Sequence, residues 1–276
     1  MSIVVSSLAE VDFETIARVF TAGYEGYLVP VSLNGEQVQA FMTRYNIDRT
    51  SSQMAYRDDK PVGIGFLGKR GKQAWVGGIG IPKVFRRRGI GEHIMNKLTD
   101  VARSSGITEI HLEFIIGNDA AQSLYEKLGY EIKRKLLIIE SQTPPTLDTD
   151  LYTIEETTIE EALGYYGEFH RLRQAWQRQP ESLRGYAPNA KGWLAQRGGK
   201  TQGYIIGIPK EPNFSLFDIA CASGESNSLI ALLAHVHQPD TTVRLVNLAD
   251  NDPVWQVLSG LGYQETMAQY EMCLKV

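Results

Sequence analysis

The stretch AWVGGIGIPKVFRRRGIG, from Ala74 to Gly91, contains the features on which the fold of the N-terminal half depends. Residues from Trp75 to Ile81 are apolar or glycine throughout, which predicts a buried strand. A short connection and three arginines follow, and the next segment predicts a helix from Glu92 to Ser105. One face of this helix is apolar and consists of Ile94, Met95, Leu98, Val101 and Ala102.

The connection between this strand and this helix has the composition of an anion-binding loop. Gly89 and Gly91 allow a tight turn and a close approach of the backbone to a ligand. The first amides of the helix point into the loop without helical partners, and the positive end of the helix dipole lies behind them. The alternative is a glycine turn with a solvated basic run. The loop matches neither the P-loop nor the dinucleotide-binding pattern. The predicted phosphate-binding residues are Arg86, Arg87, Arg88, Gly89, Ile90, Gly91 and Glu92.

A second motif follows a second predicted strand, Thr108 to Ile116, and has the sequence GNDAAQSLYEKLGYE over residues 117–131. Together the two motifs resemble the GNAT superfamily of acyl-CoA-dependent N-acyltransferases. The loop matches that family's [QR]-x-x-G-x-[GA] motif at Arg86, Gly89 and Gly91. The second segment matches N-x-x-A-x-x-L-Y-x-K-x-G-[FY] at Asn118, Ala121, Leu124, Tyr125, Lys127, Gly129 and Tyr130. One departure is Pro82, which directly follows Ile81, so that Lys83 stands where the family often has proline.

The resemblance implies an α/β fold with a mostly antiparallel twisted sheet flanked by helices, and acetyl-CoA as the cofactor. It implies that Tyr125 is the general acid that protonates the leaving thiolate, and that Asn118 and Ala121 lie at the pantetheine end of the site. A backbone amide of the central strand, at Ile79, Gly80 or Ile81, is expected to bind the thioester oxygen. Glycines in this strand leave room for a bulge and for pantetheine, namely Gly77, Gly78 and Gly80.

The acceptor side of the predicted site is less clearly marked. The segment YEGYLVPVSLNG, residues 24–35, is irregular and aromatic, and in the resembling fold it lies over the acceptor end of the cleft. We therefore expect Tyr24, Tyr27 and Phe41 to shape the substrate pocket, although packing between two helices is an equally good interpretation of each. Two candidates for the general base, Glu113 and Glu25, remain open, and the single histidine near them, His111, favours a structural role.

Other segments predict the elements that surround this site. A strand is expected over residues 2–8, a helix over 12–24 with Asp12 as its N-cap, and a second helix over 36–45. A hairpin is expected over 53–57 and 62–67, and a further strand over 135–140.

The second half of the chain repeats the first in weakened form. Strands are expected over 204–208, 216–221 and 242–248, and a helix over 228–237. Residues 250–264 align without gaps on residues 117–131, but Leu258 replaces Tyr125 and Val254 replaces Ala121. The segment 220–227 contains no arginine and a single glycine. We therefore predict a catalytic domain over 1–140, a linker over 141–149 and a degenerate GNAT-like domain over 150–276, with a chance similarity of the second half as the alternative.

Composition restricts the class of protein. The first 140 residues carry 18 Lys and Arg against 16 Asp and Glu, and the rest carries 10 against 16, so the positive excess lies beside the predicted phosphate site. The acidic pI of about 5.8 disfavours nucleic acid as a partner. No targeting or membrane-spanning segment is evident, which makes a cytoplasmic location the expectation. Cys221 and Cys273 lie far apart in the sequence and predict neither a metal site nor a disulfide.

These features predict an N-acetyltransferase that transfers an acetyl group from acetyl-CoA to the primary amine of a small molecule, a peptide or a protein. The alternative from another class is a non-catalytic acyl-CoA sensor or scaffold, which would share the binding motifs but need no base. The sequence leaves the acceptor, the length of the acyl chain and the oligomeric state open.

Overall fold

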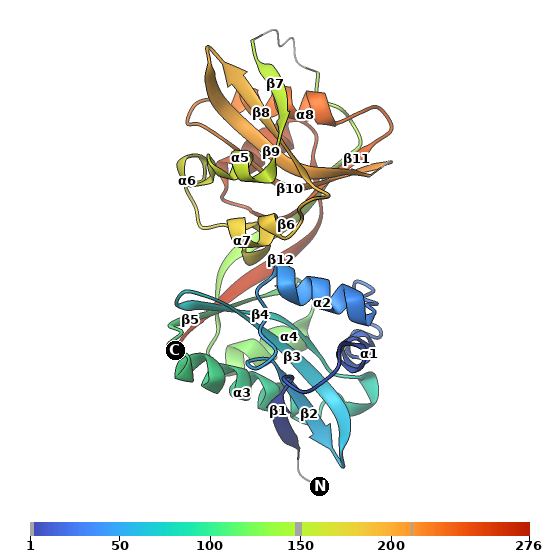
Figure 1. Cartoon of the computed structure of the whole chain (residues 1–276). Coiled ribbons are helices and arrows are strands. Elements are labelled where there is room, and N and C mark those ends of the chain that lie inside the picture. Colours follow the sequence, from blue (N-terminus) through green and yellow to red (C-terminus); the bar gives the residue numbers. More distant parts are fainter. Residues whose placement is uncertain (1–2, 147–150, 211) are drawn as a thin grey trace. The chain divides into compact units, whose positions relative to one another are not determined.

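The computed structural model of the chain describes residues 3–146, 151–210 and 212–276 (Figure 1). These residues form two compact units. Unit 1 consists of Met1–Lys133 together with Tyr270–Val276, and unit 2 consists of Arg134–Gln269. Among the described helices, none is long and apolar enough to cross a membrane.

Unit 1 is a sheet with helices on both of its faces. Its strands lie in the order β1-β2-β3-β4-β5, followed by the last part of β12. All pairs from β1 to β4 are antiparallel, whereas β4 and β5 are parallel. The elements are β1 (Val4–Ser7), α1 (Phe13–Gly23), α2 (Gly35–Arg44), β2 (Gln53–Arg57), β3 (Lys60–Arg70), β4 (Gln73–Gly80), the 3-10 helix η1 (Lys83–Phe85), α3 (Ile90–Ser104), β5 (Glu109–Ile115) and α4 (Asp119–Lys127).

Alternating residues of β3 show which helices cover which face of this sheet. A Cβ at Gly63 would lie 3.0 Å from the Ile94 side chain of α3, and a Cβ at Gly65 would lie 2.5 Å from it. Phe66 points to the other face, where its ring stacks on Phe20 of α1 with centroids 4.7 Å apart. Helix α1 also comes so close to β4 that a Cβ on Gly23 would lie 2.3 Å from the Cα of Gly80.

Unit 2 has the same plan. Its strands lie in the order β6-β11-β10-β9-β8-β7, and only the pair β10 and β11 is parallel. The elements in chain order are β6 (Glu131–Ser141), β7 (Thr153–Thr157), α5 (Ile159–Leu163), α6 (Tyr166–Phe169), η2 (Trp176–Arg178), α7 (Pro180–Arg184), β8 (Lys191–Arg197), β9 (Lys200–Lys210), β10 (Asn213–Cys221), α8 (Ser226–Val236), β11 (Thr242–Ala249), α9 (Pro253–Gly260) and β12 (Gln264–Lys275).

The register of the strands confirms that the fold is a tandem repeat. Parallel pairing ends at Val76↔Leu112 between β4 and β5, and at Leu216↔Leu245 between β10 and β11. In both repeats the next residue of the central strand is a bulge, because Gly77 and Phe217 have no partner on the neighbouring antiparallel strand. The predicted α/β class with two GNAT-like units is therefore the observed one.

The compact units have boundaries different from those of the sequence domains 1–140 and 150–276. Strand β6 follows the first repeat in the sequence, yet its residues from Arg134 onward belong to unit 2. In return, the last six residues of β12 and the C-terminal Val276 belong to unit 1, where Met272 is fully buried in the core. The exchange places each repeat's last strand in the other unit, so the repeats and the compact units do not coincide. Of the expected linker, residues 147–150 lie outside the described residues.

Most elements near the predicted site formed where the sequence placed them. Asp12 caps α1, since its Oδ1 accepts a hydrogen bond from the Thr15 amide at 2.8 Å. Asn34 caps α2 in the same way through the Gln37 amide, at 2.9 Å. The strands β7, β8 and β12 and the short helices α5 to α7 were not predicted.

Candidate active site

The candidate site begins where β4 and β5 stop pairing. The two strands are hydrogen-bonded neighbours from Gln73↔Glu109 to Val76↔Leu112, and the paired stretch ends there. Gly77 forms the predicted bulge, and Gly78 follows with a φ of 145°, which L side chains rarely adopt. The strands therefore diverge into a wedge, and backbone groups of β4 beyond Val76 face the wedge instead of β5. A second extended chain, such as a pantetheine arm, fits this arrangement.

The loop after β4 has the backbone geometry expected of an anion site. Arg87 and Gly89 adopt left-handed conformations with φ of 60° and 76°, and α3 begins at Ile90 without a side-chain cap. Within the described residues, the structure gives no protein acceptor to the amides from Arg87 to Glu92. A 15-residue helix thus presents its uncapped N-terminus to the loop. The predicted phosphate-binding residues are brought together here.

Arg86 lies differently from the expectation that its side chain reaches the phosphates. Its Nε donates to the Ile81 carbonyl at 2.8 Å, and its Nη2 donates to the carbonyls of Gly23 at 2.9 Å and Glu25 at 2.8 Å. The guanidinium therefore binds the end of β4 and the C-terminus of α1 at the same time. A planar group with forked donors can hold several carbonyls at once, which a lysine cannot do. Arg86 is a positioning residue that fixes the loop to the first helix.

The two other arginines of the loop are exposed, and the glutamate of the first turn of α3 pairs with a lysine of α4. Arg87 and Arg88 are both exposed and lie next to the uncapped end of α3. Glu92 accepts a hydrogen bond from Lys127 of α4, with 2.7 Å between Oε2 and Nζ. Gly91 lets the two helices approach, since a Cβ there would lie 3.3 Å from the Leu124 Cδ2 atom.

Helix α4 carries the predicted general acid. Asn118 caps the helix through a hydrogen bond from the Ala121 amide to its Oδ1, at 3.2 Å. Tyr125 is 9% exposed, and its ring lies 6.0 Å from the rings of both Phe114 and Tyr130. Burial raises the pKa of the Tyr125 phenol, and the neighbouring Tyr27 and Tyr130 raise it further. The phenol is therefore protonated at neutral pH and can donate a proton.

Two tyrosines of the expected acceptor segment meet Tyr125. The Tyr24 ring stands edge-on to Tyr27 with ring centroids 5.0 Å apart, and Tyr27 is close enough to Tyr125 to raise the pKa of the Tyr125 phenol. Burial raises the pKa of Tyr24, and Tyr125 and Tyr27 add to this, whereas a hydrogen bond with the Ile79 backbone lowers it. The Ile79 backbone amide therefore points toward the Tyr24 hydroxyl. Gly78 leaves the space that the Tyr24 hydroxyl occupies, because a Cβ at Gly78 would lie 2.8 Å from this hydroxyl.

The remaining predicted residues lie around an aromatic cluster on the α1 and α2 face. Phe41 is partly buried and lies 6.5 Å from Phe20 and from Trp75, measured between ring centroids. Glu113 of β5 is partly buried on this face and accepts a hydrogen bond from the Trp75 indole at 2.7 Å. Glu25 is exposed, and it is its backbone carbonyl that binds Arg86. Glu113 is therefore the better placed of the two candidate bases.

The equivalent place in unit 2 is filled by charged side chains. The matching bulges align Asp218 with Gly78. Asp218 is fully buried, and its carboxylate accepts hydrogen bonds from Arg178 at 2.6 Å and Tyr204 at 2.6 Å and contacts the His170 ring at 2.9 Å. His170 and Arg178 hold the pKa of Asp218 far below its usual range, although burial opposes this shift. This cluster occupies the space that the glycines of β4 leave open.

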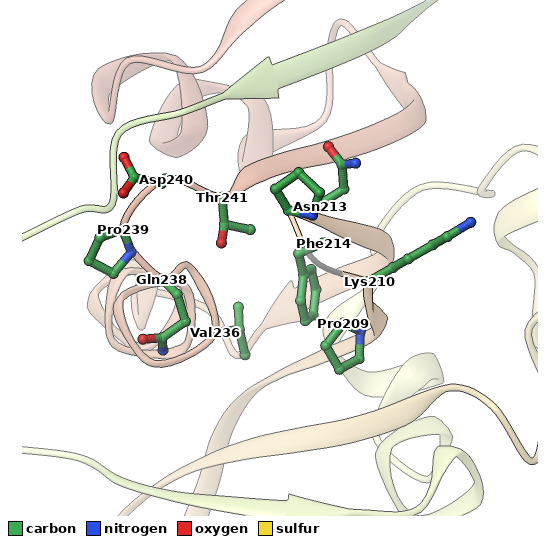
Figure 2. A pocket seen from close by; sticks show the side chains of 10 residues that line it. Pro209, Lys210, Asn213, Phe214, Val236, Gln238, Pro239, Asp240 and Thr241 are labelled. Carbon is green, nitrogen blue, oxygen red and sulfur yellow. The ribbon is translucent and has the colours of Figure 1, made fainter.

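Unit 2 also contains two hollows. One, of about 270 Å³, lies between the β10–α8 loop and the start of α9, which is the position equivalent to the cofactor loop of unit 1. Its loop, Ala222 to Gly224, contains no arginine. The other, of about 320 Å³, lies between the β9–β10 turn and the α8–β11 loop (Figure 2). Phe214 and Val236 line it together with Pro209 and Pro239, and Lys210 extends away from it.

Comparison with known proteins identifies the part of the chain that holds the wedge. The model of a family described as the Acetyltransferase (GNAT) family matches residues 20–130. Residues 20–130 are called the GNAT domain below, after the family whose model they match. The matched segment contains the bulge of β4, the loop before α3 and Tyr125, which carry the motifs of the resemblance.

The GNAT domain has a curated relative, "GCN5-related N-acetyltransferase 7, chloroplastic" from Arabidopsis thaliana. The two are 36% identical over 72 residues, which make up 26% of this chain and 25% of the relative. The similarity thus covers about a quarter of that relative's length. The family model and this relative are both named for acetyl transfer.

Solved structures resemble the whole chain. A GCN5-related N-acetyltransferase from Sphaerobacter thermophilus matches with a TM-score of 0.71 at 14% identity and covers 99% of this chain and 95% of its own. A tandem GNAT protein from the clavulanic acid biosynthesis pathway matches with the same TM-score and identity, over 99% of this chain and 98% of its own. At this level of identity the likeness concerns the fold, and it extends to both units.

Several residues of the GNAT domain's site were missed by the sequence analysis. Phe20, Phe66 and Trp75 form the floor on which Tyr24 and Phe41 rest, with ring centroids 4.7–6.5 Å apart. The signal available in the sequence was the four-residue spacing of Phe20 and Tyr24, because residues four apart lie on the same face of a helix.

Proposed function

We propose that the protein transfers an acetyl group from acetyl-CoA to a primary amine of a small molecule, a peptide or a protein, and that the GNAT domain alone carries the reaction. The observation that carries this proposal is the wedge between β4 and β5, bordered by the uncapped start of α3 and reached by Tyr24, Tyr27 and Tyr125. A wedge of this kind accepts an extended ligand, and the loop beside it binds the ligand's phosphates.

The residues present fit this cofactor. The amides from Arg87 to Glu92 would bind the pyrophosphate, and Arg87 and Arg88 would add positive charge. Backbone groups of β4 beyond Gly77 would pair with the pantetheine arm. Acetyl-CoA supplies a thioester carbonyl, which is the group that an amine attacks.

Each residue near the thioester then has one task. The Ile79 amide, which now faces the Tyr24 hydroxyl, stabilises negative charge that develops on the carbonyl oxygen. A carbon–nitrogen bond forms to the amine as the carbon–sulfur bond breaks, and Tyr125 Oη gives its proton to the leaving sulfur. Burial that raises the pKa of the phenol also raises the basicity of a thiolate in the same cleft, so the transfer stays feasible. Glu113 is the proposed acceptor of the proton that the amine loses, directly or through water.

Unit 2 is proposed to have lost this chemistry. Leu258 stands in place of Tyr125, and the carboxylate of Asp218 stands in place of the Gly78 hydrogen atom. A buried ion cluster at that point leaves no space for a thioester beside β10.

Replacing Tyr125 by phenylalanine tests the proposal. We expect Tyr125→Phe to lower kcat by about 10²–10⁴-fold with little change in the Kd for acetyl-CoA, because only the proton donor is removed. Release of CoA thiol is measured with a broad panel of amines and peptides, and cofactor binding is measured by calorimetry. Tyr130→Phe is the matched control, since the Tyr130 phenol is also buried and the variant likewise loses only a hydroxyl.

The outcomes separate the proposal from its rival. Unchanged turnover in Tyr125→Phe would remove the general acid from this mechanism. Tight binding of acetyl-CoA with no turnover on any amine would favour the non-catalytic sensor.

A further inference from the structure

A histidine of unit 1 lies between two carboxylates on one face of the sheet. His111 and Glu109 alternate along β5, and Glu271 and Cys273 alternate along β12, its neighbour in the sheet. His111 Nε2 lies 3.6 Å from Glu109 Oε2, and His111 Nδ1 lies 3.9 Å from Glu271 Oε1. His111, Glu271 and Cys273 are buried, and Glu109 is partly exposed.

The cysteine completes a compact group of possible ligand atoms. One oxygen of Glu109, one ring nitrogen of His111 and the Cys273 Sγ all lie within 4.8 Å of one another. Two ligands at about 2.0–2.1 Å from one tetrahedral ion would be about 3.3 Å apart, close to the separation of Glu109 and His111. Cys221, the other cysteine of the chain, belongs to unit 2.

We propose that Glu109, His111 and Cys273 form a zinc site, with His111 binding through Nε2. A thiolate together with an imidazole and a carboxylate is a ligand set that suits Zn²⁺, whereas Mg²⁺ and Ca²⁺ require oxygen ligands. Three protein ligands leave the fourth tetrahedral position to water, which reaches the site from the exposed side of Glu109.

The residues around the three ligands are arranged as the partners of a metal site are. Glu271 faces Nδ1 of His111, which directs Nε2 toward Glu109. A carboxylate on the far nitrogen of a metal-binding histidine fixes its tautomer and increases its basicity. The ligating Glu109 Oε2 in turn accepts a hydrogen bond from Gln73 Nε2, at 3.2 Å.

Charge also balances at this site. When zinc binds, the Cys273 thiol releases one proton to solvent, and no electron is transferred. The thiolate and the Glu109 carboxylate then neutralise the ion. The buried carboxylate of Glu271, which is 1% exposed, lies on the Nδ1 side of the His111 ring. Zinc would join β5 to the C-terminal strand and stabilise unit 1, independently of the proposed acyl transfer.

Cobalt titration of the full-length chain tests the site. The purified protein is treated with a chelator, and Co²⁺ is added as a probe, followed by Zn²⁺. We expect one equivalent of Co²⁺ with a thiolate-to-cobalt charge-transfer band, complete displacement by Zn²⁺, and an increase in Tm on adding Zn²⁺. Cys273→Ser abolishes the band, whereas the matched control Cys221→Ser retains it.

Two further variants protect the test against misfolding. Glu109 is partly exposed, so Glu109→Gln keeps the core intact, and we expect the Kd for Zn²⁺ to rise at least about tenfold. Glu271→Gln acts through His111, and we expect it to raise the Kd for Zn²⁺ about 10–100-fold. Absence of the band in the wild-type chain, its persistence in Cys273→Ser, or an unchanged Kd in Glu109→Gln overturns the proposal.

Discussion

Arg86 shows how one side chain can serve a binding site without touching the ligand. It joins the carbonyl that ends β4 to the two carbonyls at the C-terminus of α1, and these segments form opposite sides of the cofactor loop. Carbonyls at the end of a helix lack helical partners, so a cation there satisfies them and interacts favourably with the helix dipole. The motif match located Arg86 correctly but could not show which way its guanidinium turns.

We expect Arg86→Lys to destabilise the GNAT domain by about 1–3 kcal/mol, because hydrogen bonds to a charged donor are lost and carbonyls lose their partner. The Kd for acetyl-CoA should rise about tenfold, since the loop loses its fixed position. Thermal unfolding and calorimetric titration measure the two effects.

Arg88→Ala is the control, because the side chain of Arg88 is exposed. It should leave Tm unchanged and weaken binding only through charge, with an effect that fades at high salt. A lysine variant as stable as the wild type would contradict the positioning role.

At the scale of elements, the bulge in β4 connects the sheet to the chemistry. Gly77 is the extra residue of the bulge. Pairing with β3 resumes at Gly78, whose backbone conformation only glycine adopts easily. The absent Cβ of Gly78 leaves room for the Tyr24 hydroxyl and for the Phe20 ring. The bulge therefore both exposes the backbone of β4 and admits the aromatic acceptor segment.

Gly78→Ala tests this double role. A Cβ at this position would lie 2.8 Å from the Tyr24 hydroxyl and 3.1 Å from the Phe20 ring, and its φ of 145° strains any L residue. We expect kcat/KM for acetyl-CoA to fall by at least about tenfold and stability to fall by about 1–3 kcal/mol. Gly71→Ala is the matched control, since Gly71 also has a positive φ, of 52°, but has no atoms near its would-be Cβ. A loss in the control as large as that in Gly78→Ala would assign the effect to backbone strain in general.

Sequence patterns predicted the elements whose information is local. The glycine run predicted the bulge of β4, Asp12 predicted the cap of α1, and the two motifs placed the loop and Tyr125 on the correct elements. Contacts between distant segments were not predictable in this way. The direction of the Arg86 guanidinium depends on where α1 ends, and the approach of Cys273 to His111 depends on which strand neighbours β5. Neither relation leaves a periodic or spacing pattern in the sequence.

At the scale of the whole molecule, the exchange of end strands makes each unit depend on residues that are distant in sequence. Unit 1 is completed by Tyr270–Val276, whose apolar side chains Met272 and Leu274 pack in the same core as α3 and α4. The Val276 amide also donates a hydrogen bond to the Thr108 carbonyl, at 3.0 Å. The segment 1–140, although it contains every motif of the GNAT domain, therefore lacks part of its own core.

Met272→Ala measures this dependence in the intact chain. Met272 is fully buried, so its truncation should destabilise unit 1 by about 2–5 kcal/mol through lost burial and the cavity left behind. Lys275→Ala, on the same strand but exposed, is the control and should change stability by less than about 0.5 kcal/mol. Chemical denaturation followed by circular dichroism gives both values.

A chain ending at Gln269 should lose the unfolding transition of unit 1 while retaining that of unit 2, whose residues are all present. Full acyl-transfer activity in that shortened chain would show that the exchanged strand is dispensable, and the core of unit 1 would have to be complete without it.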